Sequence, residues 1–161
     1  MDPEIIRTAW HETGHTLMAY YAGIHVESVT LHFENNLLTH GSTRYDFTHV
    51  GEFDNSILLK RLIALLGGPL SQKIYESDPE IDLNNLGTDG DTIRDLLASM
   101  TLDQRLNLDL QGLIGGISTR LSTGSYAQAR ENICNRLIEY HQIHQPDLNS
   151  ILTSFQLPQL Q

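Results

Sequence analysis

The 161-residue sequence has a single cysteine, Cys134, so no disulfide can form within the chain. A chain with one cysteine has no disulfide framework and fits the cytoplasm or another reducing compartment. Basic residues are also few: 10 Lys and Arg stand against 20 Asp and Glu, and the formal net charge is −10. Because nucleic acids and anionic membranes attract basic surfaces, we expect neither as a partner.

Long hydrophobic runs are missing as well. The longest, over residues 57–70, contains Lys60 and Arg61, and it is shorter than the roughly 20 residues that a membrane-spanning helix needs. The N-terminus is acidic and then amphipathic, unlike a signal peptide. We therefore expect a soluble chain without a membrane segment. A hydrophobic content of 40% is enough for a core, and the length predicts one domain over residues 1–161.

The sequence His11-Glu12-Thr13-Gly14-His15 matches the pattern H-E-x-x-H. On a helix, residues four apart lie on the same face, so His11 and His15 can bind one tetrahedral Zn²⁺ together. Glu12 is next to the first ligand and leans over the metal instead of coordinating it. Its carboxylate can take a proton from an attacking water and pass it to a leaving amine. The motif thus predicts a zinc site with Glu12 as the catalytic base.

A helix around this motif is well supported. Asp2 can cap it, Pro3 suits the first helical position, and Gly23 is a C-terminal stop. Gly14 in the middle of the helix costs about 1 kcal/mol relative to alanine, which makes sense if another element approaches closely between the two histidines. The alternative is that two histidines on a helix are ordinary surface or core residues, since the chain has 8 in all.

A small antiparallel sheet is predicted after this helix. Residues 26–33 read as one strand, Asn35-Asn36 as a turn, and residues 37–47 as a second strand interrupted near Gly41. Its exposed edge can pair with an extended peptide, although an ordinary edge strand would look the same. The suspected substrate-binding residues on this edge are Leu37, Leu38, Thr39, His40 and Gly41. The histidines of this region are expected to be solvent-facing or structural, and they are His25, His32, His40 and His49.

The rest of the chain is predicted to be helical. Residues 53–75 form a nearly apolar, buried helix, in which Gly67 and Gly68 let a neighbouring helix approach and Pro69 kinks the helix or starts a new turn. Residues 76–91 read as a loop, with Asp91 capping a helix over 92–100. The remaining predicted segments are helices over 102–121, 126–144 and 148–155 and a frayed tail over 157–161. Residues 1–100 would form the core of the zinc site, and 101–161 a C-terminal helical part.

A catalytic zinc usually has three protein ligands, and no other histidine or cysteine stands in a suitable context. The carboxylate candidates are Glu52, Glu76, Glu80, Asp82, Asp89, Asp91 and Asp95. A carboxylate that opens a helix beside a glycine-rich loop is held by its cap position. Asp89 and Asp91 both meet this description, so the residues alone leave the third ligand open between them.

These features together resemble the peptidase domain of the FtsH family, the M41 zinc metalloproteases. The family's H-E-A-G-H is similar to residues 11–15, and its strand V-x-K-V-S/T-I to residues 26–31. Its helix L-x-G-G-R-A-A-E-E-L resembles residues 65–74, and its T-G-A-S-N-D-L resembles residues 86–92. This last similarity places Asp91 on the family's third zinc ligand.

The resemblance implies a mainly α, zincin-like α+β domain with a small antiparallel sheet and a C-terminal helical bundle. It also implies a zinc endopeptidase in which His11, His15 and Asp91 bind the metal and Glu12 is catalytic. Because family members fuse this domain to an AAA ATPase that this chain lacks, the enzyme would cut unfolded or short polypeptides without ATP. A separate AAA ATPase and assembly into a hexamer would follow from the family.

Two observations bear on how far the resemblance extends. Gln72 and Lys73 replace two acidic residues of the family, and Pro69 replaces its arginine. The alternative function is a catalytically weak or inactive FtsH-like module that assembles with or regulates an ATPase or protease partner. The presence of Glu12 favours the enzyme.

Overall fold

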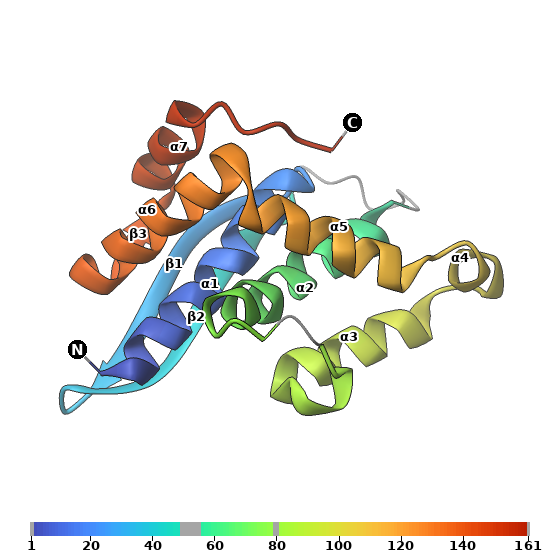
Figure 1. Ribbon diagram of the computed structural model, residues 1–161, viewed down its shortest axis with the longest axis horizontal. Helices are drawn as coiled ribbons and strands as arrows, with labels where there is room; N and C mark the ends of the chain where they lie inside the picture. Colours follow the sequence, from blue (N-terminus) through green and yellow to red (C-terminus); the bar gives the residue numbers. More distant parts are fainter. Residues whose placement is uncertain (1, 49–55, 79–80, 161) are drawn as a thin grey trace.

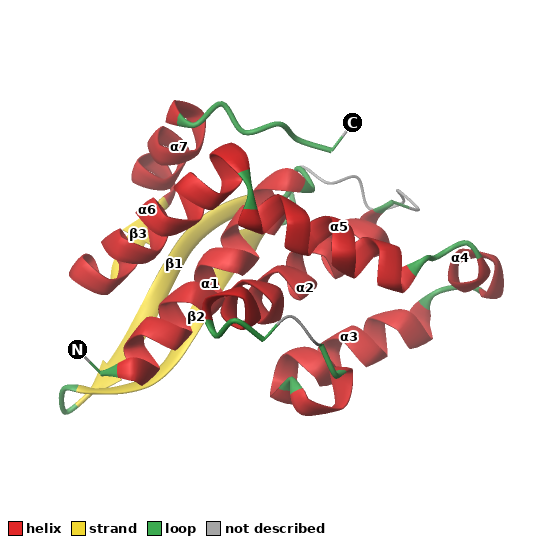
Figure 2. Ribbon diagram, in the orientation of Figure 1, coloured by secondary structure: helices red, strands yellow, loops and turns green. Residues whose placement is uncertain are grey.

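The structure, a computed structural model, describes residues 2–48, 56–78 and 81–160. Seven α-helices and a three-stranded antiparallel sheet occupy this part of the chain, which confirms the prediction of a mainly α fold with a small sheet (Figure 2). In chain order the elements are α1 (Pro3–Tyr21), β1 (His25–Glu34), β2 (Leu37–Asp46), α2 (Ile57–Tyr75), η1 (Leu83–Asn85), α3 (Gly87–Ser99), α4 (Leu102–Leu106), α5 (Leu110–Ser122), α6 (Gly124–Tyr140), β3 (Gln142–His144) and α7 (Gln145–Ser154) (Figure 1).

Helix α1 is the central element, and it begins and ends where its sequence predicts. The Asp2 side chain accepts a hydrogen bond from the Glu4 backbone N–H at 2.9 Å, Pro3 follows at the first helical position, and Gly23 has a φ of +75° just beyond the C-terminus. Every residue from 12 to 19 is buried, because α2, α6, β1 and β2 all pack against α1 (Figure 1).

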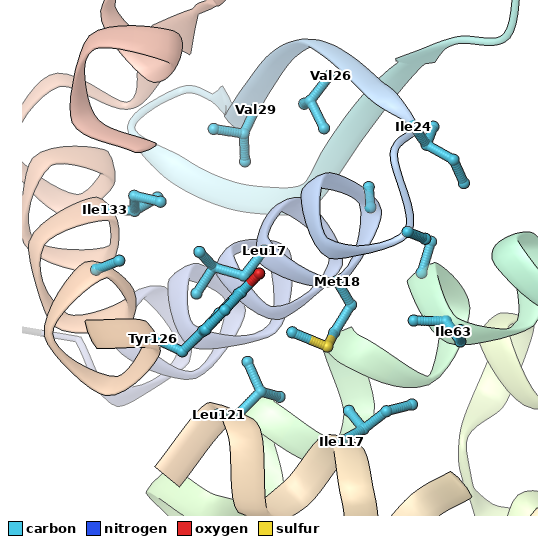
Figure 3. Packing of buried hydrophobic residues seen from close by; sticks show 14 of the residues in the cluster. Leu17, Met18, Ile24, Val26, Val29, Ile63, Ile117, Leu121, Tyr126 and Ile133 are labelled. Carbon is cyan, nitrogen blue, oxygen red and sulfur yellow. The ribbon is translucent and has the colours of Figure 1, made fainter. Parts of the chain in front are cut away.

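The hydrophobic core surrounds the second half of α1. Leu17 and Met18 are both fully buried, and they lie between the sheet on one side and α2, α5 and α6 on the others (Figure 3). Other side chains in this core are Val26, Val29, Ile63, Ile117, Leu121, Tyr126 and Ile133. The helix is thus buried from residue 12 to residue 19, whereas Pro3, Glu4 and Arg7 near its start are exposed.

The sheet has the strand order β2-β1-β3. Asn35 and Asn36 form the predicted turn between β1 and β2, with φ values of 52° and 64°. Strand β2 continues through Gly41, so the predicted interruption there is wrong. The irregularity lies at Thr39 instead, because His32 pairs with His40 and Phe33 with Leu38, which leaves Thr39 as the extra residue of a β-bulge. Within the described residues, β2 pairs only with β1 and is an edge strand.

Helices α1 and α2 pack unusually closely at their glycines. A Cβ atom added to Gly14 would lie 2.0 Å from the carbonyl oxygen of Gly67, and one added to Gly67 would lie 2.3 Å from that of Gly14. These contacts confirm that both glycines serve a close helix approach. Helix α2 continues through Pro69 to Tyr75. The predicted start of this helix, residues 53–55, lies outside the described residues.

The predicted loop over residues 76–91 is wrong in its second half. The side chain of Asp82 accepts a hydrogen bond from the Asn84 N–H at 2.9 Å and starts the short helix η1. Helix α3 then begins at Gly87, whose φ is +58°. Asp91 therefore lies inside the helix instead of capping it. The helix starts early because glycine adopts a positive φ without strain and lets the chain turn sharply there.

The C-terminal half differs from its prediction at several places, one of which is the start of α7 at Gln145 instead of residue 148. The predicted helix over 102–121 is divided into α4 and α5, because Asp109 caps a new helix through the Gly112 N–H at 2.9 Å. The predicted helix over 126–144 ends at Tyr140, where His141 takes a φ of 62°. Residues 142–144 then form β3, in which Ile143 pairs with Val29 of β1.

The tail after α7 is not frayed over its described residues, contrary to the prediction. The Leu160 N–H donates to the Tyr21 carbonyl at 2.7 Å, and the Tyr126 hydroxyl donates to the Pro158 carbonyl at 2.6 Å. The tail thus closes over the end of α1. Among the described helices, none combines the length and the hydropathy that crossing a membrane requires.

Candidate metal centre

Three side chains with metal-binding atoms converge beside the first half of α1. The Nε2 atoms of His11 and His15 are 3.1 Å apart. The Oδ2 atom of Asp89, from α3, lies 2.7 Å from Nε2 of His11 and 3.3 Å from Nε2 of His15. These atoms form a group that can hold a metal ion, and His11, His15 and Asp89 are called the metal-ligating group below.

Asp91, the ligand expected from the family resemblance, is not part of this group. It lies two residues after Asp89 on α3, which places it about 200° further around the helix. Its carboxylate is exposed and pairs with Arg94. The structure therefore corrects the assignment: of the two aspartates left open by the residues alone, Asp89 faces the histidines.

The other carboxylate candidates have different surroundings. Glu76 accepts hydrogen bonds from Arg7 and Gln72, and Asp82 caps η1. Asp95 is exposed on α3. Glu52 and Glu80 lie outside the described residues.

Both imidazole rings are held with Nε2 free to bind a metal. The Nδ1–H of His15 donates to the carbonyl oxygen of Ala64 at 2.9 Å, and Nδ1–H of His11 donates to Oε1 of Gln72 at 3.1 Å. The Gln72 amide is itself oriented, since its NH₂ group donates to Glu76 at 3.0 Å. When Nδ1 carries the proton, Nε2 has a free lone pair, which is the usual arrangement of metal-bound histidine.

The spacing of the three atoms suits a small tetrahedral ion. Zinc bonds of 2.0–2.1 Å at tetrahedral angles put two ligand atoms about 3.3 Å apart, and the three observed separations, 2.7, 3.1 and 3.3 Å, are near this value. Two imidazole nitrogens and one carboxylate oxygen form a donor set that zinc accepts. The residues present therefore fit the ion that the motif predicts.

The electrostatics of the group favour one positive charge at its centre. Burial opposes a charge on His15, but the hydrogen bond and the charge of Asp89 outweigh it and raise the pKa of His15 to about 9. Burial alone would raise the pKa of Asp89, but its hydrogen bonds with His11 and His15 hold that pKa well below its usual range. A bound metal cation would take the place of the proton that makes His15 positively charged.

Glu12 lies beside the metal-ligating group and is fixed by β2. Its side chain is buried, and its Oε2 atom accepts a hydrogen bond from the Thr43 hydroxyl at 2.7 Å. Gly41 packs so closely that an added Cβ would lie 2.5 Å from Cγ of Glu12. Within the described residues, Oε1 of Glu12 accepts no hydrogen bond and is free to contact a bound molecule.

The metal-ligating group and Glu12 line a cavity of about 280 Å³ that is open at one side, here called the metal cavity. Strand β2 contributes Gly41, Ser42, Thr43 and Tyr45 to it. Of the five suspected substrate-binding residues, only Gly41 lines this cavity. Leu37, Leu38, Thr39 and His40 lie further along the strand, toward the hairpin turn, so the edge beside the metal-ligating group starts at Gly41.

Two residues of the site could not be assigned from sequence alone. Gln72 stood out only as a departure from the acidic residues of the FtsH family. Thr43 had no signal beyond its place in a strand, two residues after Gly41 and hence on the same face. The protein-family models and the curated proteins with which the chain was compared gave no match.

Proposed function

We propose that this chain is a zinc-dependent endopeptidase of M41 type that hydrolyses unfolded or short polypeptides and needs no ATP of its own. The observation that carries the proposal is the position of Glu12, which shares a cavity with the convergent His11, His15 and Asp89. A metal site that served only to stabilise the fold would have no need of a buried carboxylate next to it that is not a ligand.

The residues divide the chemistry between them. When bound by His11, His15 and Asp89, zinc would supply Lewis acidity, polarising the peptide carbonyl and making water easier to deprotonate. Glu12 accepts the proton of the attacking water and delivers it to the nitrogen of the leaving peptide. Thr43 holds Oε2 of Glu12, so that one carboxylate oxygen keeps its direction toward the reacting groups.

The substrate follows from the edge strand. An extended peptide that pairs with the edge of β2 on which no described strand lies passes Gly41 and Thr43 and so reaches Glu12. Only an unfolded segment can supply such a strand, so this domain by itself would act on unfolded or short polypeptides. A separate AAA ATPase would extend the range to folded proteins, and assembly into a hexamer is expected from the family resemblance.

The test is cleavage of fluorescein-labelled casein by wild type and Glu12→Gln, with zinc measured in both proteins. We expect Glu12→Gln to keep its zinc and to lose at least ~100-fold in rate, the usual contribution of a general base. Glu27→Gln is the matched control, because Glu27 is an exposed carboxylate on β1 that pairs with Arg44. It should cleave like wild type.

Equal cleavage by wild type and Glu12→Gln would contradict the peptidase function. A wild-type protein that binds zinc and cleaves no substrate would instead support the alternative, an inactive module that assembles with an ATPase or protease partner.

A further inference from the structure

A chain of three hydrogen bonds connects the metal-ligating group to the surface of the protein. The Nδ1–H of His11 donates to Oε1 of Gln72 at 3.1 Å, and the NH₂ group of Gln72 donates to Oε1 of Glu76 at 3.0 Å. The same Oε1 atom of Glu76 accepts a second hydrogen bond from Nε–H of Arg7 at 2.7 Å. His11 is thus connected to a carboxylate, but only through an amide.

The Gln72 amide has two different ends, and the position of the His11 proton depends on which end faces the ring. With Oε1 toward the ring, Nδ1 carries the proton and Nε2 has a free lone pair. With the NH₂ group toward the ring, Nδ1 must accept, so the proton of the neutral ring lies on Nε2. Oδ2 of Asp89, 2.7 Å from Nε2, would then accept a hydrogen bond from it. This second arrangement leaves no lone pair for a metal ion, although its net charge is the same.

Glu76 distinguishes the two arrangements because an ionised carboxylate can only accept hydrogen bonds. It stabilises the NH₂ group of Gln72 on its own side, and it would repel the amide oxygen in the same place. Arg7 keeps the carboxylate in position, and the Glu76 side chain is only 26% exposed. Glu76 and Asp89 therefore act in opposite directions on one proton: Asp89 attracts it to Nε2 of His11, and Glu76 keeps it on Nδ1.

We propose that Glu76 is a positioning residue of the metal centre, which acts through Gln72 to keep the His11 proton on Nδ1 and so leaves Nε2 to the metal. The inference rests on the zinc site of the proposed function. Glu76 itself touches neither the metal-ligating atoms nor a substrate. When Glu76 is lost, the Gln72 amide turns its NH₂ group toward the ring, and the hydrogen bond to Asp89 must be broken before a metal can bind.

The first test measures zinc affinity by competition with a fluorescent chelator. Glu76→Leu removes the acceptor and keeps a side chain of similar size. We expect it to bind zinc about 10-fold more weakly than wild type, the lower end of the ~10–100-fold range for residues that support a metal ligand. Glu4→Leu is the matched control, because Glu4 is a carboxylate that also pairs with Arg7 at 2.7 Å, from α1 instead of the end of α2. It should bind zinc like wild type.

The second test asks whether Glu76 acts through the amide. In Gln72→Glu both ends of the side chain are acceptors, so the ring meets an acceptor whichever way the group is turned. Adding Glu76→Leu to Gln72→Glu should therefore leave the zinc affinity unchanged or raise it. A general weakening of the fold would instead lower the affinity in both backgrounds. The same loss from Glu76→Leu with and without Gln72→Glu would overturn the proposal.

A third measurement needs neither zinc nor cleavage and separates this inference from the peptidase function. ¹⁵N NMR of zinc-free protein labelled at histidine shows which ring nitrogen carries the proton, and the His11 signals are identified by their loss in His11→Ala. We expect the proton on Nδ1 in wild type and in Glu4→Leu, and its displacement toward Nε2 in Glu76→Leu. An unchanged Nδ1–H in Glu76→Leu would overturn the inference, whatever the protein cleaves. The expected displacement in a protein that cleaves nothing would contradict the peptidase function alone.

Discussion

Two pairs of histidines lie in contact in this protein, and they differ in almost every other respect. The rings of His11 and His15 are nearly perpendicular, with centres 4.7 Å apart, and both contact Asp89. His32 and His40 are opposite each other on β1 and β2, stacked with their centres 4.3 Å apart and 12° between the rings. By the distance between ring centres alone, the second pair would be the better candidate for a metal site.

The difference lies in what the other ring nitrogens contact. In the first pair each Nδ1–H is bound by an acceptor from α2, so both Nε2 atoms point to one place. In the second pair His32 contacts the Ser42 hydroxyl through Nε2, and His40 contacts that of Thr39 through Nδ1. No third ligand joins this pair among the residues that the structure describes. A metal site thus requires more than ligands that lie close together. The second nitrogen of each ring must also be held by a hydrogen bond that directs the first nitrogen at the metal.

The distinction between the two histidine pairs would fail most directly if either pair behaved like the other in metal binding. His11→Ala should reduce zinc from about one ion per chain to none, because two ligands cannot hold the ion in place of three. His40→Ala should leave the zinc content unchanged. Both are measured by metal analysis after dialysis against a weak chelator, and zinc lost in His40→Ala would place the metal on the sheet.

The second largest effect is expected at Gly68. A Cβ atom there would lie 2.3 Å from Nε2 of His15, whereas one at Gly115 on α5 meets nothing within 4 Å. Gly68→Ala should therefore displace the imidazole, abolish tight zinc binding and destabilise the fold by about 1–3 kcal/mol. Gly115→Ala should be neutral or stabilise by up to about 1 kcal/mol. Thermal unfolding with and without zinc measures both, and wild-type zinc affinity in Gly68→Ala would count against the site.

The part of the site that could be predicted from sequence is the part built by neighbours along the chain. His11, Glu12 and His15 lie on one helix, and their spacing alone determines which of them share a face. The close approach at Gly14 and Gly67 was also predictable, since a glycine inside a helix is costly without a packing reason. The start of α1 at Pro3 followed in the same way from its cap residues.

The remaining features depend on where distant segments meet. Asp89 and Asp91 are two residues apart, so moving the start of α3 from residue 92 to Gly87 decides which one faces the histidines. Strand β3 has three residues, too few to show a periodicity, and it exists because Ile143 pairs with Val29. Likewise, the break between α4 and α5 depends on the single cap at Asp109.

A smaller effect is expected from the residue behind His11. Gln72→Leu removes the acceptor of the His11 Nδ1–H, which should weaken zinc binding by about 10–100-fold, as is typical when such a partner is lost. Gln72→Glu keeps an acceptor and should bind zinc at least as tightly as wild type. Competition with a fluorescent chelator measures the affinities, and unchanged binding in Gln72→Leu would show that the ring needs no support from α2.

The smallest effect should come from the hairpin that carries the second histidine pair. Thr43→Val removes the hydroxyl that holds Glu12, and we expect cleavage to slow about tenfold, in line with the loss of one hydrogen bond to a charged group. Zinc content should not change. Thr39→Val on the same strand is the control, because the Thr39 hydroxyl contacts the His32 carbonyl and Nδ1 of His40, away from Glu12. Equal rates in the two variants would mean that Thr43 does not position the base.

The most direct test of the central claim is the zinc content of Asp89→Ala compared with Asp91→Ala. Both residues are on α3, and the structure places the first against His11 and His15 and the second against Arg94. We predict about one zinc per chain in wild type and in Asp91→Ala, and none in Asp89→Ala. Zinc retained in Asp89→Ala and lost in Asp91→Ala would contradict the site described here.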